Sequence, residues 1–228
     1  MAFCLTFTIA GFSQPTEWHL GASAGLTYLQ HQDIPQSSFH YYDVVPKFGY
    51  DLFVRVERPV YKSLRASGTI GYLNSRFEAR HFDGFYNPAD TIRDYQQYFW
   101  SDFTVHYLTI QAGLAYKFSD KLILRTAIRS NVQLYSQART RRVHLTNTYG
   151  QNVFFPSYLH KAESIHAADW GLSSSVTHQL YHGLHLEASF FLGTRPVWNE
   201  GELEQRFISR QFTLGIVYVF YKNQFSDK

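Results

Sequence analysis

The sequence predicts an all-β protein: an eight-stranded antiparallel up-and-down transmembrane β-barrel of the outer-membrane type. Apolar and polar residues alternate in eight segments, short and long connections alternate between these segments, and aromatic residues gather at both ends of them. Successive side chains of a strand point to opposite faces, so each segment has one apolar and one polar side. A closed barrel uses both sides, because its outer surface meets lipid and its inner surface lines the interior.

The first expected strand shows the alternation most clearly. Its apolar residues all have even numbers: Trp18, Leu20, Ala22, Ala24, Leu26 and Tyr28. The seven later strands keep this parity and cover residues 48–56, 64–72, 108–118, 122–134, 168–176, 184–192 and 208–220. Each is about ten residues long, which is the length that a tilted strand needs to cross a bilayer.

The connections between these strands also alternate. Short turns are expected at residues 59–63, 119–121 and 181–183, where Asp120 and Gly183 suit tight backbone geometry. Long polar loops are expected at residues 29–47, 78–102, 136–164 and 193–204. Barrels of this kind place short turns in the periplasm and long loops outside, so both ends of the chain are expected in the periplasm of a Gram-negative bacterium.

Aromatic residues are expected to form two girdles, since amphipathic rings prefer the headgroup zone of a membrane. The girdle beside the short turns would contain Trp18, Tyr116, Phe118, Tyr218 and Phe220. The opposite girdle would contain Tyr28, Phe48, Tyr50, Tyr72 and Trp170. A soluble β-sandwich is the main structural alternative, but its large aromatics would concentrate at mid-strand, and it seldom pairs uniform strands with such regular connections.

Composition is consistent with a barrel and says little about partners. After the extreme N-terminus no stretch approaches the run of about 18 apolar residues that a membrane helix needs. The mean hydropathy is negative, and the formal net charge of +3 gives no reason to expect a nucleic-acid partner.

The N-terminus resembles a secretion signal. Residues 3–12 are apolar, and the small residues Gly11 and Ser13 suit a cleavage site, although a basic start is missing. We therefore expect residues 1–13 to be a truncated signal peptide and residues 14–228 to be a single barrel domain. Cys4, the only cysteine, would leave with the signal; too few residues precede it for a lipoprotein signal.

Three strand patterns resemble a known family. They are GASAGLTY at residues 21–28, HYLTIQAGLAYKF at residues 106–118 and FTLGIVYVF at residues 212–220, and they look like the PorT-like small outer-membrane barrels of Bacteroidetes. The resemblance covers nearly the whole mature chain and implies the fold and the outer-membrane location. It implies no single activity, because some members assist a secretion system and most have no assigned role.

The polar side of the strands carries many charges. An eight-stranded barrel is just wide enough for side chains to fill it, so buried charges of both signs must pair there. We expect a lumen ion-pair network rather than an open pore, with a small-solute channel as the alternative. Its members would be Asp51, Arg55, Glu57, Arg65, Lys117, Arg125, Arg129, Asp169 and Glu187.

Catalysis and metal binding have weaker support. Some eight-stranded barrels modify lipid A, which requires a nucleophile and a base to converge on the outer surface. The outward polar candidates Ser130, Ser174, His166 and His178 form no such motif, so no catalytic residue is expected; a lipid-A-modifying enzyme stays open as an alternative. The eleven histidines lack metal-ligand spacing, even where His178, His182 and His185 cluster, so no metal or cofactor is expected.

The long loops are therefore the expected place of function. Arg139, Arg141 and Arg142 would open the longest loop just above the bilayer, where guanidinium groups suit the phosphates of lipopolysaccharide; a solvated loop face is the alternative. Aromatic clusters at residues 39–42, 82–86 and 95–100 suggest a contact surface for a partner protein. The sequence thus predicts a non-enzymatic structural or interaction protein.

Overall fold

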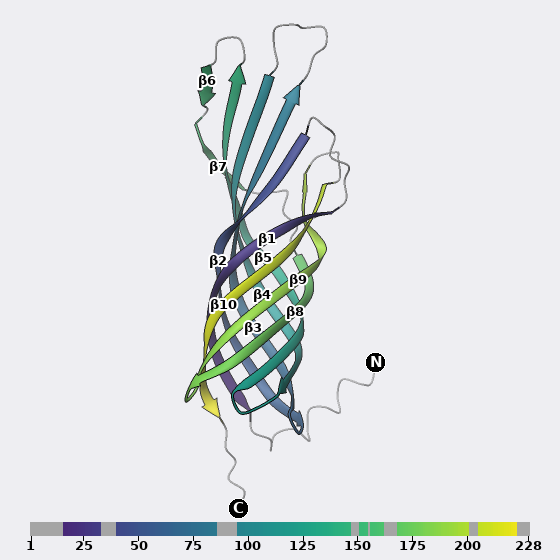
Figure 1. Cartoon of the computed structure of the whole chain (residues 1–228), viewed down its shortest axis with the longest axis vertical. Coiled ribbons are helices and arrows are strands. Elements are labelled where there is room, and N and C mark those ends of the chain that lie inside the picture. The colour runs from purple at the N-terminus through teal and green to yellow at the C-terminus, as the bar shows by residue number, and fades with distance from the viewer. Residues whose placement is uncertain are drawn as a thin grey trace, which may run out of the picture.

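Eight long strands close into a barrel. The computed structural model describes residues 16–32, 40–85, 95–146, 151–154, 156–161, 168–200 and 205–222. Its strands are β1 (Glu17–Gln32), β2 (His40–Tyr61), β3 (Leu64–Phe85), β4 (Tyr95–Lys117), β5 (Leu122–Thr146), β6 (Gln151–Phe154), β7 (Tyr158–Lys161), β8 (Ala168–Tyr181), β9 (Leu184–Glu200) and β10 (Gln205–Lys222). All strands but β6 and β7 form an antiparallel ring that closes where β1 pairs with β10, which confirms the predicted fold (Figure 1). Within these ranges, no helix is long and apolar enough to cross a membrane.

Short turns join β2 to β3, β4 to β5 and β8 to β9 at one end of the barrel, where β1 begins and β10 ends (Figure 1). We call this the turn end and the opposite end the loop end. Gly183 has a φ of 73°, as its place in a tight turn requires, and Lys62 adopts a φ of 45° in the β2–β3 turn. The Ser119 hydroxyl accepts hydrogen bonds from the backbone amides of Lys121 and Leu122.

The predicted alternation separates an apolar outside from a filled inside. Outward residues such as Leu20, Ile70 and Leu214 are each more than half exposed, whereas Glu57 and Thr109, which point inward, are fully buried. Both predicted aromatic girdles lie on the outside, and Trp18, Tyr28, Phe48, Tyr50, Tyr116, Phe118, Trp170, Tyr218 and Phe220 are all exposed. Such an apolar belt around a closed sheet is the surface that lipid solvates.

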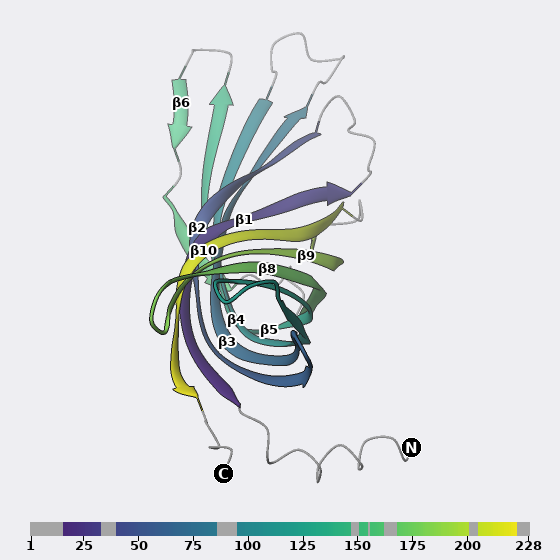
Figure 2. The same cartoon turned by 60° about the horizontal axis from the view of Figure 1, so that its bottom comes forward.

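Four strands are much longer than predicted. These strands, β2 to β5, contain 22, 22, 23 and 25 residues. Large parts of the predicted loops 29–47, 78–102 and 136–164 are therefore strands. Residues 194–200 of the fourth predicted loop, 193–204, also belong to a strand, β9. The loop prediction was wrong there because aromatic residues, which suggested contact surfaces, also favour strands. Residues 40–47, 76–85, 95–104 and 137–146, with β6 and β7, form a sheet that rises beyond the barrel on one side (Figures 1 and 2). We call it the projecting sheet.

A β-bulge in β5 reverses its parity just below the projecting sheet. Leu134 and Tyr135 are both exposed although they are neighbours, and the pairing of β4 with β5 shifts between His106 and Tyr107. Beyond this point the even residues of β5 are buried, among them Ser136 and Ala138. A bulge places two successive residues on one side, so each later side chain faces opposite to the extrapolated pattern.

The inner face at the base of the projecting sheet is apolar. Phe77 and Phe103 stack with ring centroids 4.9 Å apart, and both side chains are buried. The full cluster contains Val44, Leu73, Phe77, Ala79, Phe103, Val105, Tyr107 and Ala138. Apolar packing therefore borders the polar lumen on its loop-end side.

Candidate functional site: a charged lumen and a basic outer face

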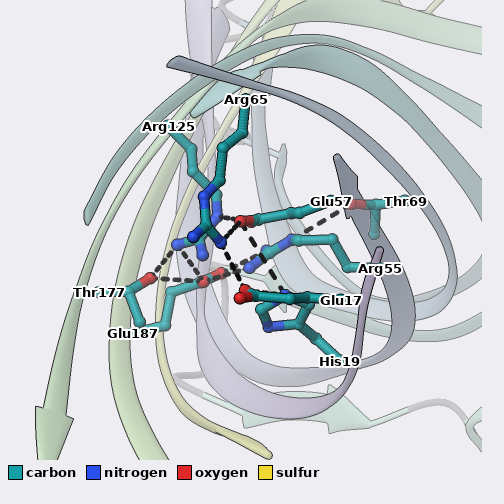
Figure 3. A network of polar contacts seen from close by, with 9 residues as sticks. All are labelled: Glu17, His19, Arg55, Glu57, Arg65, Thr69, Arg125, Thr177 and Glu187. Carbon is teal, nitrogen blue, oxygen red and sulfur yellow. Dashed lines mark hydrogen bonds and ion pairs between the residues drawn. The ribbon is translucent and has the colours of Figure 1, made fainter. Parts of the chain in front are cut away.

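A network of ion pairs crosses the lumen near the turn end (Figure 3). Arg55 of β2 donates two hydrogen bonds to Glu187 of β9, at 2.6 and 2.7 Å, so a bidentate pair bridges opposite walls. Arg125 of β5 donates from Nε to Glu57 Oε1 at 2.5 Å, and its Nη1 lies 3.4 Å from Glu187 Oε2. Thr177 donates to Glu187 at 2.8 Å. Paired geometry of this kind is what allows charges to remain in a dry interior.

A second group of charges joins this network from the turn end (Figure 3). Arg65 Nη1 is hydrogen-bonded to Glu17 Oε2 and lies 3.6 Å from Glu57 Oε2. The His19 Nε2 atom lies 3.8 Å from Glu17 Oε2 and 3.9 Å from Glu57 Oε2, and it makes no hydrogen bond within the described part of the chain. Glu17 and His19 were not predicted as network members, although their odd numbers place them on the inward face of β1.

The glycine at position 21 helps to hold this network in place. A Cβ atom there would lie 2.2 Å from the Phe53 ring, so the absence of a side chain makes room for that ring. The Arg55 guanidinium lies 4.8 Å from the centre of the same ring, in a cation–π contact. Gly21 therefore supports the position of Arg55 through Phe53.

A further charged group lies nearer the loop end. Arg129 Nη2 is 3.6 Å from Asp51 Oδ2, and Arg129 Nε donates to Asn131 at 2.8 Å. Its guanidinium also lies 5.1 Å from the centre of the Phe191 ring. Asp169 accepts a hydrogen bond from Ser209. Several buried polar atoms here make no hydrogen bond to a described residue, including Asp51 Oδ1 and Arg129 Nη2, so ordered water is expected to bind them.

The structure thus divides the predicted lumen residues into three groups. Arg55, Glu57, Arg65, Arg125 and Glu187 lie in the network near the turn end; Asp51, Arg129 and Asp169 lie nearer the loop end. Lys117 is not in either group: it forms a 2.7 Å ion pair with Asp120, which is almost fully exposed at the β4–β5 turn.

A pocket of about 320 Å³ lies at the turn end, directly below the network. Its walls include Glu17, His19, Arg65, Lys117 and His185. Glu17 and His19 can therefore be reached from this end of the barrel.

The outer face of the projecting sheet is rich in cations. Opposite residues of paired strands share a face, so the pairing places six cationic side chains together with three carboxylates. These residues are Lys47, Arg76, Arg80, Arg139, Arg141 and Lys161, with Asp43, Glu78 and Asp102. Positive charge is in excess, and all of the cations except Lys47 are exposed.

Within this basic face two of the three acidic residues, Glu78 and Asp102, are already paired. Lys47 Nζ lies 2.9 Å from Glu78 and is also hydrogen-bonded to Asp102, and Arg80 donates to Glu78 at 2.6 Å. Burial alone would raise the pKa of Glu78, but the hydrogen bonds from Arg80 and Lys47 outweigh it and hold that pKa below its ordinary value. Arg139 and Arg141 lie on the same outer face, and both side chains are exposed. Arg142 of β5 is paired with Phe99 of β4, but its side chain lies outside the described part.

An aromatic row separates this basic face from the apolar belt. The Tyr72 hydroxyl is hydrogen-bonded to His106 Nδ1, and the rings of Tyr50, Tyr72, His106 and Tyr135 follow one another at centroid distances of about 6 Å. Tyrosine at such a level is typical of a membrane–water interface. The basic face therefore begins where the lipid headgroups at the loop end of the barrel would lie.

The three outward polar candidates for catalysis that the structure describes, Ser130, Ser174 and His178, do not converge. Ser174 and His178 are both exposed on β8, but four residues of strand separate their Cα atoms by roughly 13 Å. Ser130 is paired with Trp170 and Ile110 rather than with a histidine. His166 lies outside the described residues. The side chains of five further histidines are also outside the described part: His31, His40, His81, His144 and His160.

Comparison with known proteins gives structural matches alone. No protein-family model matches the sequence, and no curated protein matches it significantly. Among solved structures, the chain matches Ail of Yersinia pestis, crystallised with the heparin analogue sucrose octasulfate, at a TM-score of 0.41 and 10% identity over 91% of this chain and 99% of Ail. It matches neisserial surface protein A at 0.36 and 9% (89% and 97% covered) and OprG of Pseudomonas aeruginosa at 0.36 and 9% (91% and 96% covered). Matches this distant assign no role to any residue.

Proposed function

We propose that this outer-membrane barrel is a non-enzymatic interaction protein whose projecting sheet binds the phosphate groups of lipopolysaccharide. The observation that carries the proposal is the position of the basic face: Arg76, Arg139 and Arg141 are exposed on strands that continue beyond the outward aromatic row. Guanidinium groups form bidentate hydrogen bonds with phosphate, and lipid A carries phosphates at this depth. In this arrangement the turn end and both chain termini face the periplasm.

The charged lumen has a structural role in this proposal. Its ion pairs link β2, β5 and β9 across the interior and fill the space between them, so they hold the barrel rigid beneath the projecting sheet. A partner protein would bind the sheet or its loops. An accessory role in secretion or envelope assembly rests on the resemblance to PorT-like barrels.

Replacing Arg76, Arg139 and Arg141 together with Ser should weaken glycolipid binding and leave folding intact. Hydrogen bonds to charged groups contribute about 1.5–3 kcal/mol each, so the affinity for lipid A should fall by at least about tenfold. The measurement is the amount of lipopolysaccharide that co-purifies with the barrel from outer membranes, together with a titration by purified lipid A.

The matched control replaces Lys62 and Lys121, two exposed cations at the turn end, with Ser. This control should retain the wild-type amount of glycolipid. Equal retention by the triple variant and the control would show that the basic face is a solvated surface. Crosslinking in native outer membranes, followed by mass spectrometry, would then identify any protein partner.

A further inference from the structure

Three donor atoms at the turn end are arranged like an incomplete metal site. A carboxylate oxygen of Glu17, the imidazole of His19 and a carboxylate oxygen of Glu57 all lie within 4.8 Å of one another. His19 Nε2 stands 3.8 and 3.9 Å from the two carboxylate oxygens. Two donors of a tetrahedral zinc ion with bonds of about 2.0–2.2 Å lie roughly 3.3–3.6 Å apart, so the two distances from His19 are only slightly longer than a bound ion requires, and water would be the fourth ligand.

Two of these donors are buried and unsatisfied. His19 is 2% exposed and Glu57 is fully buried, yet His19 Nε2 and Glu57 Oε2 make no hydrogen bond to any described residue. Buried polar atoms without a hydrogen bond are costly in a dry interior and need an explanation, although Arg65 Nη1 lies 3.6 Å from Glu57 Oε2. A cation that binds both atoms would satisfy them together.

The surroundings of Glu57 also suit a ligand. Arg125 is bonded to Glu57 Oε1, which fixes the carboxylate and leaves Oε2 directed toward His19 and Glu17 (Figure 3). Ligating carboxylates commonly have such a hydrogen-bonded outer partner. The pocket at the turn end supplies an entry path, because Glu17 and His19 form part of its wall.

We propose that Glu17, His19 and Glu57 bind one divalent cation of the zinc class, for which the Arg65 guanidinium competes. Arg65 Nη1 contacts Glu17 and lies 3.6 Å from Glu57, so its positive charge now stands between the two carboxylates. Arg65 also lines the pocket, into which its side chain can withdraw when a metal ion arrives. One imidazole and two carboxylates favour zinc or cobalt over calcium and magnesium, which prefer oxygen donors alone.

The bound ion would connect β1 to β2 at the start of the barrel. Glu17 and His19 lie on β1, and Glu57 lies opposite Glu17 on β2. Metal binding would therefore stabilise the folded barrel by linkage, because the unfolded chain has no preformed site.

Titration of the refolded full-length barrel with Co²⁺ tests the proposal. The wild type should bind one ion per chain with the absorption of tetrahedral cobalt, Zn²⁺ should displace it, and Ca²⁺ and Mg²⁺ should not. His19→Gln and Glu17→Gln should each lower the affinity by at least about tenfold, and Arg65→Gln should raise it by about tenfold, since it removes the competing cation. Heat-modifiable migration in gels reports that each variant is folded.

His182→Ala is the matched control, because this exposed histidine borders the same pocket but is not one of the three ligands. It should bind as the wild type does. Binding that survives in His19→Gln and Glu17→Gln would overturn the site. Absence of stoichiometric binding by the wild type would also overturn it, even if Arg65→Gln bound the ion, because Arg65 would then be a permanent occupant.

Discussion

Glu187→Gln is expected to lower the free energy of unfolding by about 3–5 kcal/mol, because it removes one partner of a buried ion pair and leaves the other charged. Glu187 accepts both hydrogen bonds of Arg55 and lies 3.4 Å from Arg125. The neutral amide cannot balance these two guanidinium groups. Urea-dependent unfolding in lipid vesicles, followed by tryptophan fluorescence, measures the loss.

Two comparison variants isolate the buried pair. Asp120→Asn removes an exposed ion pair with Lys117, which solvent screens, and it should leave the unfolding midpoint almost unchanged. Arg55→Met combined with Glu187→Leu removes both charges, and it should recover most of the stability lost in the single variant. An unfolding midpoint of Glu187→Gln equal to that of Asp120→Asn would contradict a structural role of the network. Steady currents from the wild type in planar bilayers would favour the channel alternative instead.

An arginine on the lipid-facing side has the second largest expected effect. Leu114 and Leu214 are 46% and 51% exposed on the outside of the barrel. Leu214 lies near the middle of β10, whereas Leu114 lies close to the turn-end limit of β4. Leu214→Arg should destabilise the barrel by about 2–4 kcal/mol, the range for a charge at the bilayer midplane, and Leu114→Arg, nearer the turn end, should cost less. Refolding titrations in lipid measure this change.

The control for this pair is a polar change on the opposite side of the same strand. Gln111 of β4 points toward the lumen, where it accepts a hydrogen bond from Ser173 at 3.4 Å. Gln111→Ser should cost no more than about 1 kcal/mol, because it removes one modest hydrogen bond. If the leucine and glutamine variants lost equal stability, the assignment of lipid-facing and lumen-facing sides would fail.

Alternation in the sequence was enough to predict the barrel part of each long strand and most of the inward charges. Arg55, Arg125 and Glu187 were expected in the lumen from parity alone, and all three are buried there. Their partners could not be predicted, because the pairing of Arg55 with Glu187 depends on which walls of the closed barrel face each other. Glu17 and His19 share the inward parity of β1, so the same pattern could have included them.

The projecting sheet was missed for two physical reasons. Aromatic residues such as Tyr98 and Trp100 suit both a strand and a binding loop, so composition does not mark the residue at which β4 begins. The bulge in β5 also interrupts the alternation of apolar and polar residues that predicts the strands. The adjacent apolar residues Leu134 and Tyr135 are the local sign of the bulge, and beyond it Arg139 and Arg141 belong to a strand face rather than to a loop.

The proposed binding of surface glycolipid requires the projecting sheet to lie outside the cell. Single cysteines at Arg139 or Arg141 in a Cys4→Ser background, treated with a bulky polymer-coupled maleimide on intact cells, test this directly. We expect both to be labelled, whereas cysteines at the turn-end positions Lys62 and Lys121 should react only after the outer membrane is permeabilised. Labelling of the turn-end cysteines on intact cells, with Arg139→Cys and Arg141→Cys protected, would contradict the orientation and the proposed binding of surface glycolipid.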